Sequence, residues 1–240
     1  MKFTDMVKDR RSFLKLLLGV SAAPLLTACA SQRSPMTKRH NQRIHPLPDD
    51  EFEMPAALRD WKPLEEPDFL TIVGARPRSE WAGAAPIVSR MNPMGRVEHI
   101  TVHHEGMAPV YFDSTRDVAS QLDLVRRSHL NRMQAGDIGY HFIIDRAGRL
   151  WQGRPLAFQG AHVKYHNRHN LGVMVMGNFD KQSPTQAQRD ALVTFLRKSQ
   201  SAFNVPVRLV HTHQELAPTA CPGVTLQGFM KDIRGNGTLT

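Results

Sequence analysis

The sequence is poor in cysteine and lacks a long apolar run near its start. Its 240 residues include two cysteines, Cys29 and Cys221, so one bridge between them is the only disulfide open to the chain. The apolar run at residues 16–26 is shorter than the roughly 20 residues that a membrane-spanning helix needs. Residues 70–240 contain no Lys/Arg-rich run and no recognisable nucleic-acid-binding motif, which argues against a nucleic-acid partner.

The charge is positive and unevenly spread. The formal net charge is +9, and residues 70–240 hold twenty basic and twelve acidic side chains. A hydrophobic share of 41% and a charged share of 22% are ordinary for a globular protein, and the length suits one sizeable domain with appendages. The excess of basic residues favours an anionic partner, such as a membrane surface or an acidic polymer.

The first 29 residues have the features of an export signal. Arg10 and Arg11 precede Phe-Leu-Lys, an apolar run follows, and the segment ends in Leu-Thr-Ala-Cys29. A charged start, an apolar run and small residues before a break are typical of a signal peptide. The paired arginines resemble a twin-arginine signal, and the ending resembles the lipobox of bacterial lipoproteins, whose cysteine is lipidated. We therefore predict a twin-arginine lipoprotein signal peptide at residues 1–29; a plain cleaved signal or an N-terminal helix with a chance cysteine are the alternatives.

Residues 30–69 are predicted to form a flexible tether, with room for one short helix at residues 55–61. Six prolines interrupt any long helix there, and charged residues alternate without apolar periodicity. A lipid on Cys29 would hold the exported chain at the periplasmic face of the cell envelope, because buried acyl chains anchor a protein stably. Ala30 stands in place of the Asp that retains many lipoproteins at the inner membrane, which favours the outer membrane.

The pattern of apolar residues predicts a central mixed β-sheet with helices packed on it. Strands are expected at residues 97–104, 139–144, 149–152, 171–176 and 207–211, and helices at 116–132 and 183–201. The second helix is predicted to have Ser183 as its cap and Pro184 at its first position. Strands interleaved with helices give an α/β fold, and we assign residues 70–240 to a single, monomeric domain of this class.

Two segments carry side chains that can bind a metal. One is His103-His104 at the end of the first predicted strand, and the other runs from His211 through His213 to Cys221. A catalytic zinc site takes three protein ligands from Cys, His, Asp or Glu and leaves one position for water. Cys221 precedes Pro-Gly, a turn that could direct its sulfur back toward the first strand. Because the chain has twelve histidines, surface or packing roles compete with metal binding for each of them.

Five ordered blocks of sequence carry a resemblance to a known family. They are Ile-Thr-Val-His103-His104, then Gly136 to Ile144, then Gly148 to Arg154, then Gly160-Ala-His162 with Asn167 and Gly172 to Phe179, and last His213 to Gly223. Over roughly residues 70–232 they resemble the zinc amidases of the peptidoglycan recognition protein family and the related phage amidase lysozymes. The resemblance implies the amidase type 2 fold. It also implies hydrolysis of the peptidoglycan amide that joins N-acetylmuramic acid to L-alanine.

Carried over position by position, the resemblance makes His103, His213 and Cys221 the ligands of one zinc ion per chain. Adjacent strand residues point to opposite faces, so His103 and His104 are not expected to reach the same metal. His211 and His213 share a face if the strand continues, so spacing alone does not separate them, and the family match favours His213. His104, His211 and His129 are otherwise expected to pack or to line a groove.

The same match implies the remaining site residues. Tyr140 is expected to orient water or to stabilise the oxyanion of the reaction. Thr219 stands where phage relatives carry a lysine and many recognition-protein amidases a threonine, and its hydroxyl can donate one hydrogen bond without supplying charge. His162 and Asn167 match groove positions and are expected to bind substrate, although structural packing is an equal alternative for His162.

Two other functions compete with the amidase hypothesis. Family members that lack the cysteine bind peptidoglycan without cutting it, so a non-catalytic recognition module is the first alternative. The presence of His103, His213, Cys221 and Tyr140 together favours an enzyme. A zinc hydrolase that acts on another amide is the second alternative, and the predicted export favours a wall substrate because peptidoglycan is the abundant polymer on that side of the membrane.

Replacing the predicted lipidation site tests the anchor. In a Cys29→Ala chain the acyl chains have no attachment point, so we expect the protein to move from the membrane fraction to the soluble fraction, as followed by immunoblotting. Cys221→Ala is the matched control, because it removes the other cysteine and should leave the chain with the membrane. A Cys29→Ala protein that still sediments with the membrane would refute the lipid anchor.

Overall fold

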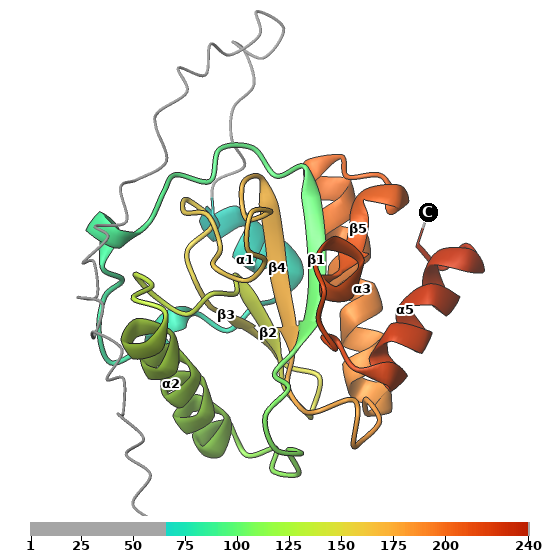
Figure 1. Cartoon of the computed structure of the whole chain (residues 1–240), viewed down its shortest axis with the longest axis horizontal. Coiled ribbons are helices and arrows are strands. Elements are labelled where there is room, and N and C mark those ends of the chain that lie inside the picture. Colours follow the sequence, from blue (N-terminus) through green and yellow to red (C-terminus); the bar gives the residue numbers. More distant parts are fainter. Residues whose placement is uncertain (1–65, 240) are drawn as a thin grey trace, which may run out of the picture. The chain divides into compact units, whose positions relative to one another are not determined.

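A five-stranded mixed sheet organises the molecule (Figure 1). The structure is a computed structural model that describes residues 66–239. The strands are β1 (His99–His104), β2 (Phe142–Ile144), β3 (Leu150–Gln152), β4 (Asn170–Val175) and β5 (Val210–Thr212). The α-helices are α1 (Glu66–Val73), α2 (Thr115–Arg132), α3 (Gln186–Phe203), α4 (His213–Leu216) and α5 (Val224–Gly235). Three short 3-10 helices are η2 (Arg78–Glu80), η3 (Val88–Arg90) and η4 (Val207–Leu209).

The strands follow the order β3-β2-β4-β1-β5 across the sheet. β2, β4, β1 and β5 run parallel, and β3 at one edge runs antiparallel to β2. Every residue of the central strand β4 is buried, as expected for a parallel strand that is covered on both faces. The predicted mixed sheet with helices packed on it is therefore confirmed.

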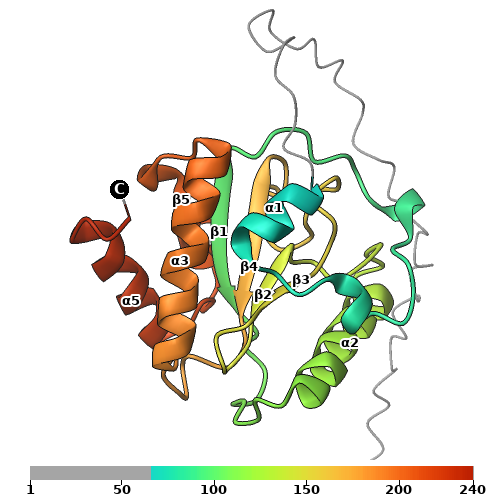
Figure 2. The same cartoon turned by 180° about the vertical axis from the view of Figure 1, so that it is seen from behind.

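The alternation of side chains along the strands divides the core into two layers. Ile100 and Val102 of β1 belong to an apolar cluster with residues of α1, α3 and α5. Met174 of β4 belongs to a second cluster with residues of α2. Figures 1 and 2 show α1 and α3 on one side of the sheet. His103 alternates with Val102 along β1 and therefore points to the other side, the α2 side.

The helix α2 forms where the apolar spacing predicted it. Ser114 caps its first turn, since its Oγ accepts a hydrogen bond from Asp117 N at 3.1 Å. The apolar residues four and three positions apart lie on one face and are buried: Val118, Leu122 and Val125. Burial of such a side chain stabilises the fold by about 1.5–3 kcal/mol, so this face fixes α2 against the sheet.

The helix α3 begins later than predicted, with Thr185 as its cap instead of Ser183. Thr185 Oγ1 accepts from Gln188 N at 3.0 Å, and Gln188 Oε1 accepts from Thr185 N at 3.1 Å, which completes a capping box. Two overlapping Ser/Thr-x-x-Gln patterns occur in the sequence, and the second is selected because the Thr185 hydroxyl also donates to Arg146 O. Pro184 accordingly precedes the cap. The predicted inward residues are buried: Leu192, Phe195 and Leu196.

Three further boundaries differ from the predicted ones by three residues or more. β2 begins at Phe142, three residues after the predicted start, and β5 is preceded by η4, so it starts at Val210. At the N-terminal side, α1 begins at Glu66, before the predicted domain start at residue 70. Phe69 of α1 is fully buried among the sheet and α3, so the folded part extends at least to residue 66.

Several predictions concern residues outside the described part of the chain. The signal peptide at 1–29, the lipidated Cys29, the helix at 55–61 and most of the tether all fall before residue 66. Within residues 66–239, none of the helices combines the length and the apolar character needed to cross a membrane.

A buried histidine joins β2 to the neighbouring strand. His141 Nδ1 accepts from Gly172 N at 2.9 Å, and its Nε2 donates to Phe158 O at 3.0 Å. A second proton, on Nδ1, would point at the Gly172 N–H group, which cannot accept it. The side chain is also fully buried. Burial lowers the pKa of His141 from 6.5 to about 4. The folded chain therefore holds this imidazole neutral at pH values where an unfolded chain would protonate it.

The buried imidazole makes stability depend on pH. Between pH 6.5 and pH 4 the unfolded state binds a proton that the folded state does not, so the free energy of unfolding falls as the pH falls. In a His141→Gln chain the amide can replace both hydrogen bonds without titrating. We expect this variant to lose about 2 kcal/mol less stability than the wild type between pH 7 and pH 5, measured by urea unfolding in the presence of a chelator. Identical pH dependence of the two proteins would contradict this account.

Candidate metal centre

The register of the sheet brings together the ends of β1 and β5. Val102 lies opposite Thr212 in the parallel pair, so the next residues, His103 and His213, follow at the same level. Their rings lie 4.8 Å apart between centroids. His103 is fully buried, whereas His213 is half-buried at the first position of α4. Two histidines that are far apart in the sequence thus meet at one end of the sheet.

Cys221 reaches this point through a short loop after α4. The loop is closed where Gln214 N donates to Cys221 O at 2.9 Å, and a turn follows where Gly223 N donates to Ala220 O at 2.7 Å. Gly223 has a φ of 86° and no room for a side chain, because a Cβ would lie 2.6 Å from the Phe179 backbone. The turn that contains Cys221 therefore packs against His104 at the end of β1 and against Phe179, in the segment that follows β4.

Three potential ligand atoms converge at this place. The side-chain donors of His103, His213 and Cys221 all lie within 4.8 Å of one another, and Cys221 Sγ is 3.6 Å from His103 Nδ1. Two imidazoles and one thiol are the donor types that zinc prefers, and three protein ligands leave one position open. The donor set therefore fits a catalytic zinc site.

The protonation states of the donors suit a cation. Burial lowers the pKa of His103 well below 6.5 and also lowers the pKa of His213, so both imidazoles are neutral near pH 7. Burial raises the pKa of the Cys221 thiol to about 12, although His104 N donates to its sulfur at 3.4 Å. Neutral imidazoles are the metal-binding form, and the charge of a bound metal stabilises a thiolate that would otherwise stay protonated.

Tyr140 lies beside His103, one of the three donors. Its ring centroid is 5.1 Å from that of His103, and no hydrogen bond of its hydroxyl is found within residues 66–239. Burial raises the pKa of Tyr140 above its usual value of 10, and the nearby Cys221 and Glu105 act in the same direction. The phenol is therefore protonated at neutral pH and can donate a hydrogen bond.

A buried arginine fixes the backbone around Tyr140. Arg154 N donates to Tyr140 O at 2.8 Å, and the guanidinium donates to the carbonyl oxygens of Ile138, Asp137 and Gln159. His129 Nδ1 accepts from Gly139 N at 2.8 Å on the other side. His129 is thus a packing residue that supports the segment before Tyr140, one of the two uses expected for it.

The other predicted substrate residues make contacts inside the protein. Both ring nitrogens of His162 are engaged, one with His103 and one with Asn170 O, which leaves no hydrogen-bonding atom of this side chain for a substrate. Asn167 Oδ1 accepts from His162 N and Val163 N, both at 2.9 Å, and so closes the turn after His162. The packing alternative describes His162 better than the substrate-binding one, because its ring is buried in the sheet and not exposed in a groove.

Thr219 is exposed, and its oxygen accepts from Cys221 N at 3.2 Å. The hydroxyl therefore helps to shape the loop that presents the thiol, and its hydrogen remains able to donate.

The side chains of the remaining candidate histidines, His104 and His211, do not belong to the donor cluster. His104 Nδ1 accepts from Phe179 N at 3.3 Å, on the opposite side of β1 from His103, as the alternation predicts. His211 contacts His99, with ring centroids 5.7 Å apart. The strand β5 ends at Thr212 and α4 begins at His213, so His211 and His213 do not share a face.

One acidic residue near the site escaped the sequence analysis. Glu105 directly follows β1, and its Oε1 accepts a hydrogen bond from Gln121 of α2. Within the described chain its Oε2 is buried without a hydrogen-bond partner, and burial raises the pKa of this carboxyl group. The signal that could have revealed Glu105 is its place immediately after the two histidines of the strand.

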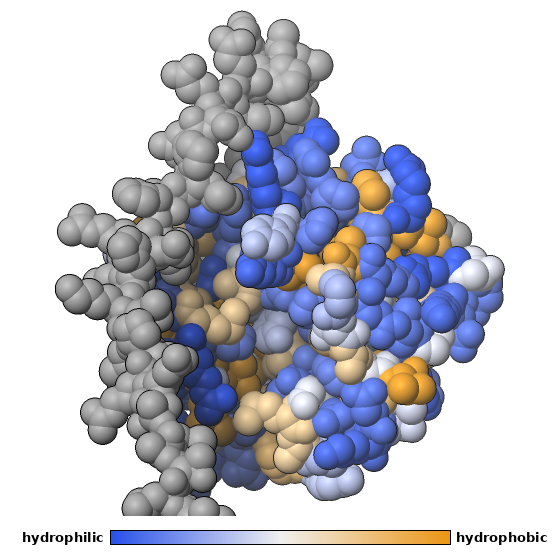
Figure 3. All heavy atoms as spheres, in the orientation of Figure 1, coloured by the Kyte–Doolittle hydropathy of each residue, from blue (hydrophilic) through white to orange (hydrophobic). Residues whose placement is uncertain are grey.

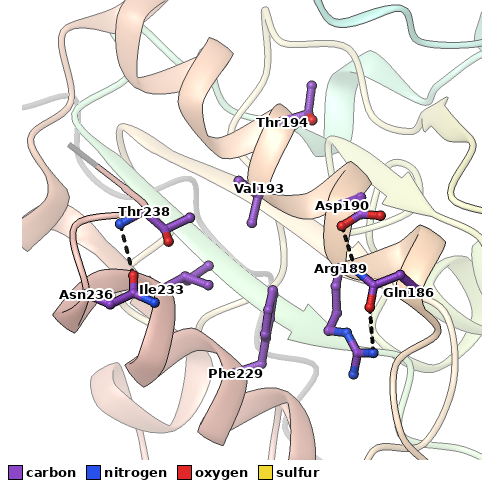
Figure 4. A pocket seen from close by; sticks show the side chains of 9 residues that line it. All are labelled: Gln186, Arg189, Asp190, Val193, Thr194, Phe229, Ile233, Asn236 and Thr238. Atoms are coloured by element: carbon purple, nitrogen blue, oxygen red, sulfur yellow. Dashed lines mark hydrogen bonds between the residues drawn. The ribbon is translucent and has the colours of Figure 1, made fainter.

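A separate hollow of about 630 Å³ lies between α3 and α5 (Figure 4). Its polar side chains pair locally, since Gln186 donates to Asp190 and accepts from Arg189. Both helices belong to the core layer opposite to His103, so this hollow is not part of the candidate site. On the face in Figure 3, apolar residues lie in separate groups among hydrophilic ones.

The chain is similar in sequence to known amidases and peptidoglycan-recognition proteins. The sequence profile of a family described as N-acetylmuramoyl-L-alanine amidase matches residues 93–224. A human protein named N-acetylmuramoyl-L-alanine amidase is 33% identical over 172 residues, which cover 68% of this chain and 29% of that protein's length. A peptidoglycan-recognition protein of Drosophila melanogaster is 31% identical over 157 residues, which cover 65% of this chain and 84% of that protein.

The fold is shared with solved structures. A mutant of Drosophila PGRP-LB in complex with tracheal cytotoxin aligns with a TM-score of 0.58 at 24% identity, over 69% of this chain and 96% of that chain.

Removing the thiol tests the ligand set. A Cys221→Ala chain keeps two of the three donors, so we expect its zinc content after dialysis to fall from one equivalent to near zero, measured by metal analysis. His211→Ala is the matched control, because this histidine lies two residues from His213 but outside the cluster, and it should retain one zinc. Full zinc content in the Cys221→Ala protein would exclude the proposed ligands.

Proposed function

Because this chain belongs to the N-acetylmuramoyl-L-alanine amidase family, we propose that it hydrolyses the amide between N-acetylmuramic acid and L-alanine in peptidoglycan. The observation that carries the proposal is the convergence of His103, His213 and Cys221 beside Tyr140. Such a cluster supplies what amide hydrolysis requires, namely a place to activate water and a donor for the charge that develops on the carbonyl oxygen.

One zinc ion per chain would be held by His103, His213 and Cys221. Zinc in such a site supplies Lewis acidity, which makes water nucleophilic near pH 7 and polarises a carbonyl. The protein contributes neutral imidazoles, a half-buried thiol and a backbone amide, His104 N, that donates to the sulfur. The imidazoles are thus in the form that binds a cation, whereas the thiolate would be stabilised by the metal itself.

The side chains around the donors would act on the substrate directly. Attack of water on the scissile carbonyl forms a C–O bond and places negative charge on the carbonyl oxygen, and Tyr140 donates its hydroxyl proton in a hydrogen bond to that oxygen. Thr219 can donate one further hydrogen bond, because its oxygen already accepts from Cys221 N. Breakage of the C–N bond then releases the stem peptide, and its amine takes up the proton that the attacking water gives up.

The recognition-module alternative is less well supported. The relatives include both amidases and recognition proteins. A module that only binds peptidoglycan needs no thiol among its histidines, whereas this chain places Cys221 Sγ 3.6 Å from His103 Nδ1. The second alternative, a zinc hydrolase that acts on another amide, would use the same metal site and the same reaction on a different substrate.

The proposed substrate fits the predicted location of the chain. Tracheal cytotoxin, which the PGRP-LB neighbour binds, is described as monomeric diaminopimelic acid-type peptidoglycan in another solved complex. A twin-arginine signal and a lipid on Cys29 would place a monomeric enzyme at the periplasmic face of the envelope, within reach of the wall. The basic character of residues 70–240 favours the anionic stem peptides.

Product analysis on purified sacculi tests the function. We expect the zinc-loaded full chain to release stem peptides with a free L-alanine amine, identified by mass spectrometry, and a chelator to stop the release until zinc is restored. Tyr140→Phe should retain zinc and lower kcat by about 10²–10³-fold, since it removes the proposed oxyanion donor. Tyr111→Phe is the control, because Tyr111 is an exposed tyrosine that should leave kcat unchanged.

Each outcome separates the hypotheses. Zinc-loaded protein that leaves muropeptides intact would support the recognition module and refute the enzyme. Cleavage of a different amide would keep the metal chemistry and reject the proposed substrate. A Tyr140→Phe protein as active as the wild type would remove the tyrosine from the mechanism.

A further inference from the structure

We propose that His162 is a positioning residue that fixes the tautomer of His103, so that His103 Nδ1 presents a lone pair to the metal. The inference rests on the metal centre of the proposed function, although it concerns the metal-free protein as much as the loaded one. It replaces the substrate-binding interpretation of His162 with one that its contacts support.

The first step is the tautomer of His162. Its Nε2 lies 3.1 Å from Asn170 O, and a carbonyl oxygen only accepts hydrogen bonds, so Nε2 must carry a proton. The ring is buried, and its hydrogen-bond partners are an imidazole and a carbonyl oxygen, so a second proton would create a buried cation without a carboxylate partner. His162 Nδ1 is therefore an unprotonated acceptor.

The second step transfers this constraint to His103. His103 Nε2 lies 3.0 Å from His162 Nδ1, and since the latter can only accept, His103 Nε2 must donate. A neutral His103 with a proton on Nε2 has a free lone pair on Nδ1. That atom faces Cys221 Sγ at 3.6 Å, within the donor cluster. The chain of hydrogen bonds thus runs from Asn170 O through His162 to the candidate ligand.

The fold provides a seat for the His162 ring. Gly172 of β4 lies under it, since a Cβ there would be 2.5 Å from His162 Cδ2, and a Cβ at Gly160 would be 2.2 Å from the same atom. Two glycines therefore leave the space that the imidazole fills beside His103. With 7% of its surface exposed, the ring has no freedom to turn toward a substrate.

Asn170, at the other end of this series of hydrogen bonds, is also held in place. Asn170 Oδ1 accepts from Thr101 Oγ1 at 2.9 Å, and Asn170 Nδ2 donates to His166 O at 2.7 Å. The main chain of His162 is fixed independently, because its N–H group donates to Asn167 Oδ1. The acceptor for His162 Nε2 is thus fixed before a metal binds, and partners of this kind commonly change metal affinity about 10–100-fold when they are removed.

Two substitutions separate positioning from packing. His162→Phe keeps a ring in the seat but removes both nitrogens, and we expect its zinc dissociation constant, measured by competition with a chelator, to rise about 10–100-fold. His162→Gln can accept from His103 Nε2 and donate to Asn170 O, so we expect it to bind zinc within a few-fold of the wild type. The thermal midpoint of each metal-free full chain shows whether the fold survives.

A spectroscopic measurement tests the proposal without any substitution. In the metal-free wild-type chain, long-range proton–nitrogen NMR correlations should show His103 protonated on Nε2 and bare on Nδ1. His103 found protonated on Nδ1 would overturn the proposal, and so would unchanged zinc affinity in a folded His162→Phe chain. The proposed function fails on different grounds, namely intact muropeptides in the presence of zinc-loaded wild-type protein.

Discussion

The candidate site depends on the register of β1 between its two parallel neighbours. Val102 lies opposite Thr212 on one side, which brings His103 and His213 to the same level, and Thr101 lies opposite Gly172 on the other. A shift of one residue would turn every β1 side chain to the other face and move His103 from the α2 side into the apolar layer. The apolar residues that alternate with His103 along the strand are therefore what secures its direction.

The cluster is also arranged so that it can be buried at low cost. Removing a charged group from water costs far more than removing a neutral one, and the lowered pKa values of His103 and His162 show that the fold holds both imidazoles neutral. Three of the four ring nitrogens of His103 and His162 are hydrogen-bonded to each other or to a carbonyl oxygen, and the fourth, His103 Nδ1, faces Cys221 Sγ at 3.6 Å. Because the donors are uncharged and hydrogen-bonded, the protein can fold without a metal and bind a cation afterwards.

The sequence predicted the elements whose signals are local. The β-branched run before His103 and the three- and four-residue spacing in α2 both reflect burial of one face, and both were found within two residues of the predicted bounds. The choice between His211 and His213 could not be made from spacing, because it depends on where β5 ends. At that end Thr212 N donates to Glu215 Oε2 at 2.9 Å in the first turn of α4, an interaction that competes with continuation of the strand.

The contacts of His162 lay beyond sequence reasoning for a different reason. They require partners on β1 and β4 and a gap left by two glycines, and of these only Gly160 is close to His162 in the sequence. The polar groups around the site differ in whether their hydrogen-bonding atoms are already engaged within the protein. Both ring nitrogens of His162 and the Oδ1 atom of Asn167 hold the protein in shape, whereas no partner of the Tyr140 hydroxyl is found in residues 66–239. A protonated phenol beside a set of candidate metal donors would be useful to a reaction that develops negative charge on oxygen, and this available hydroxyl supports the proposal of catalysis.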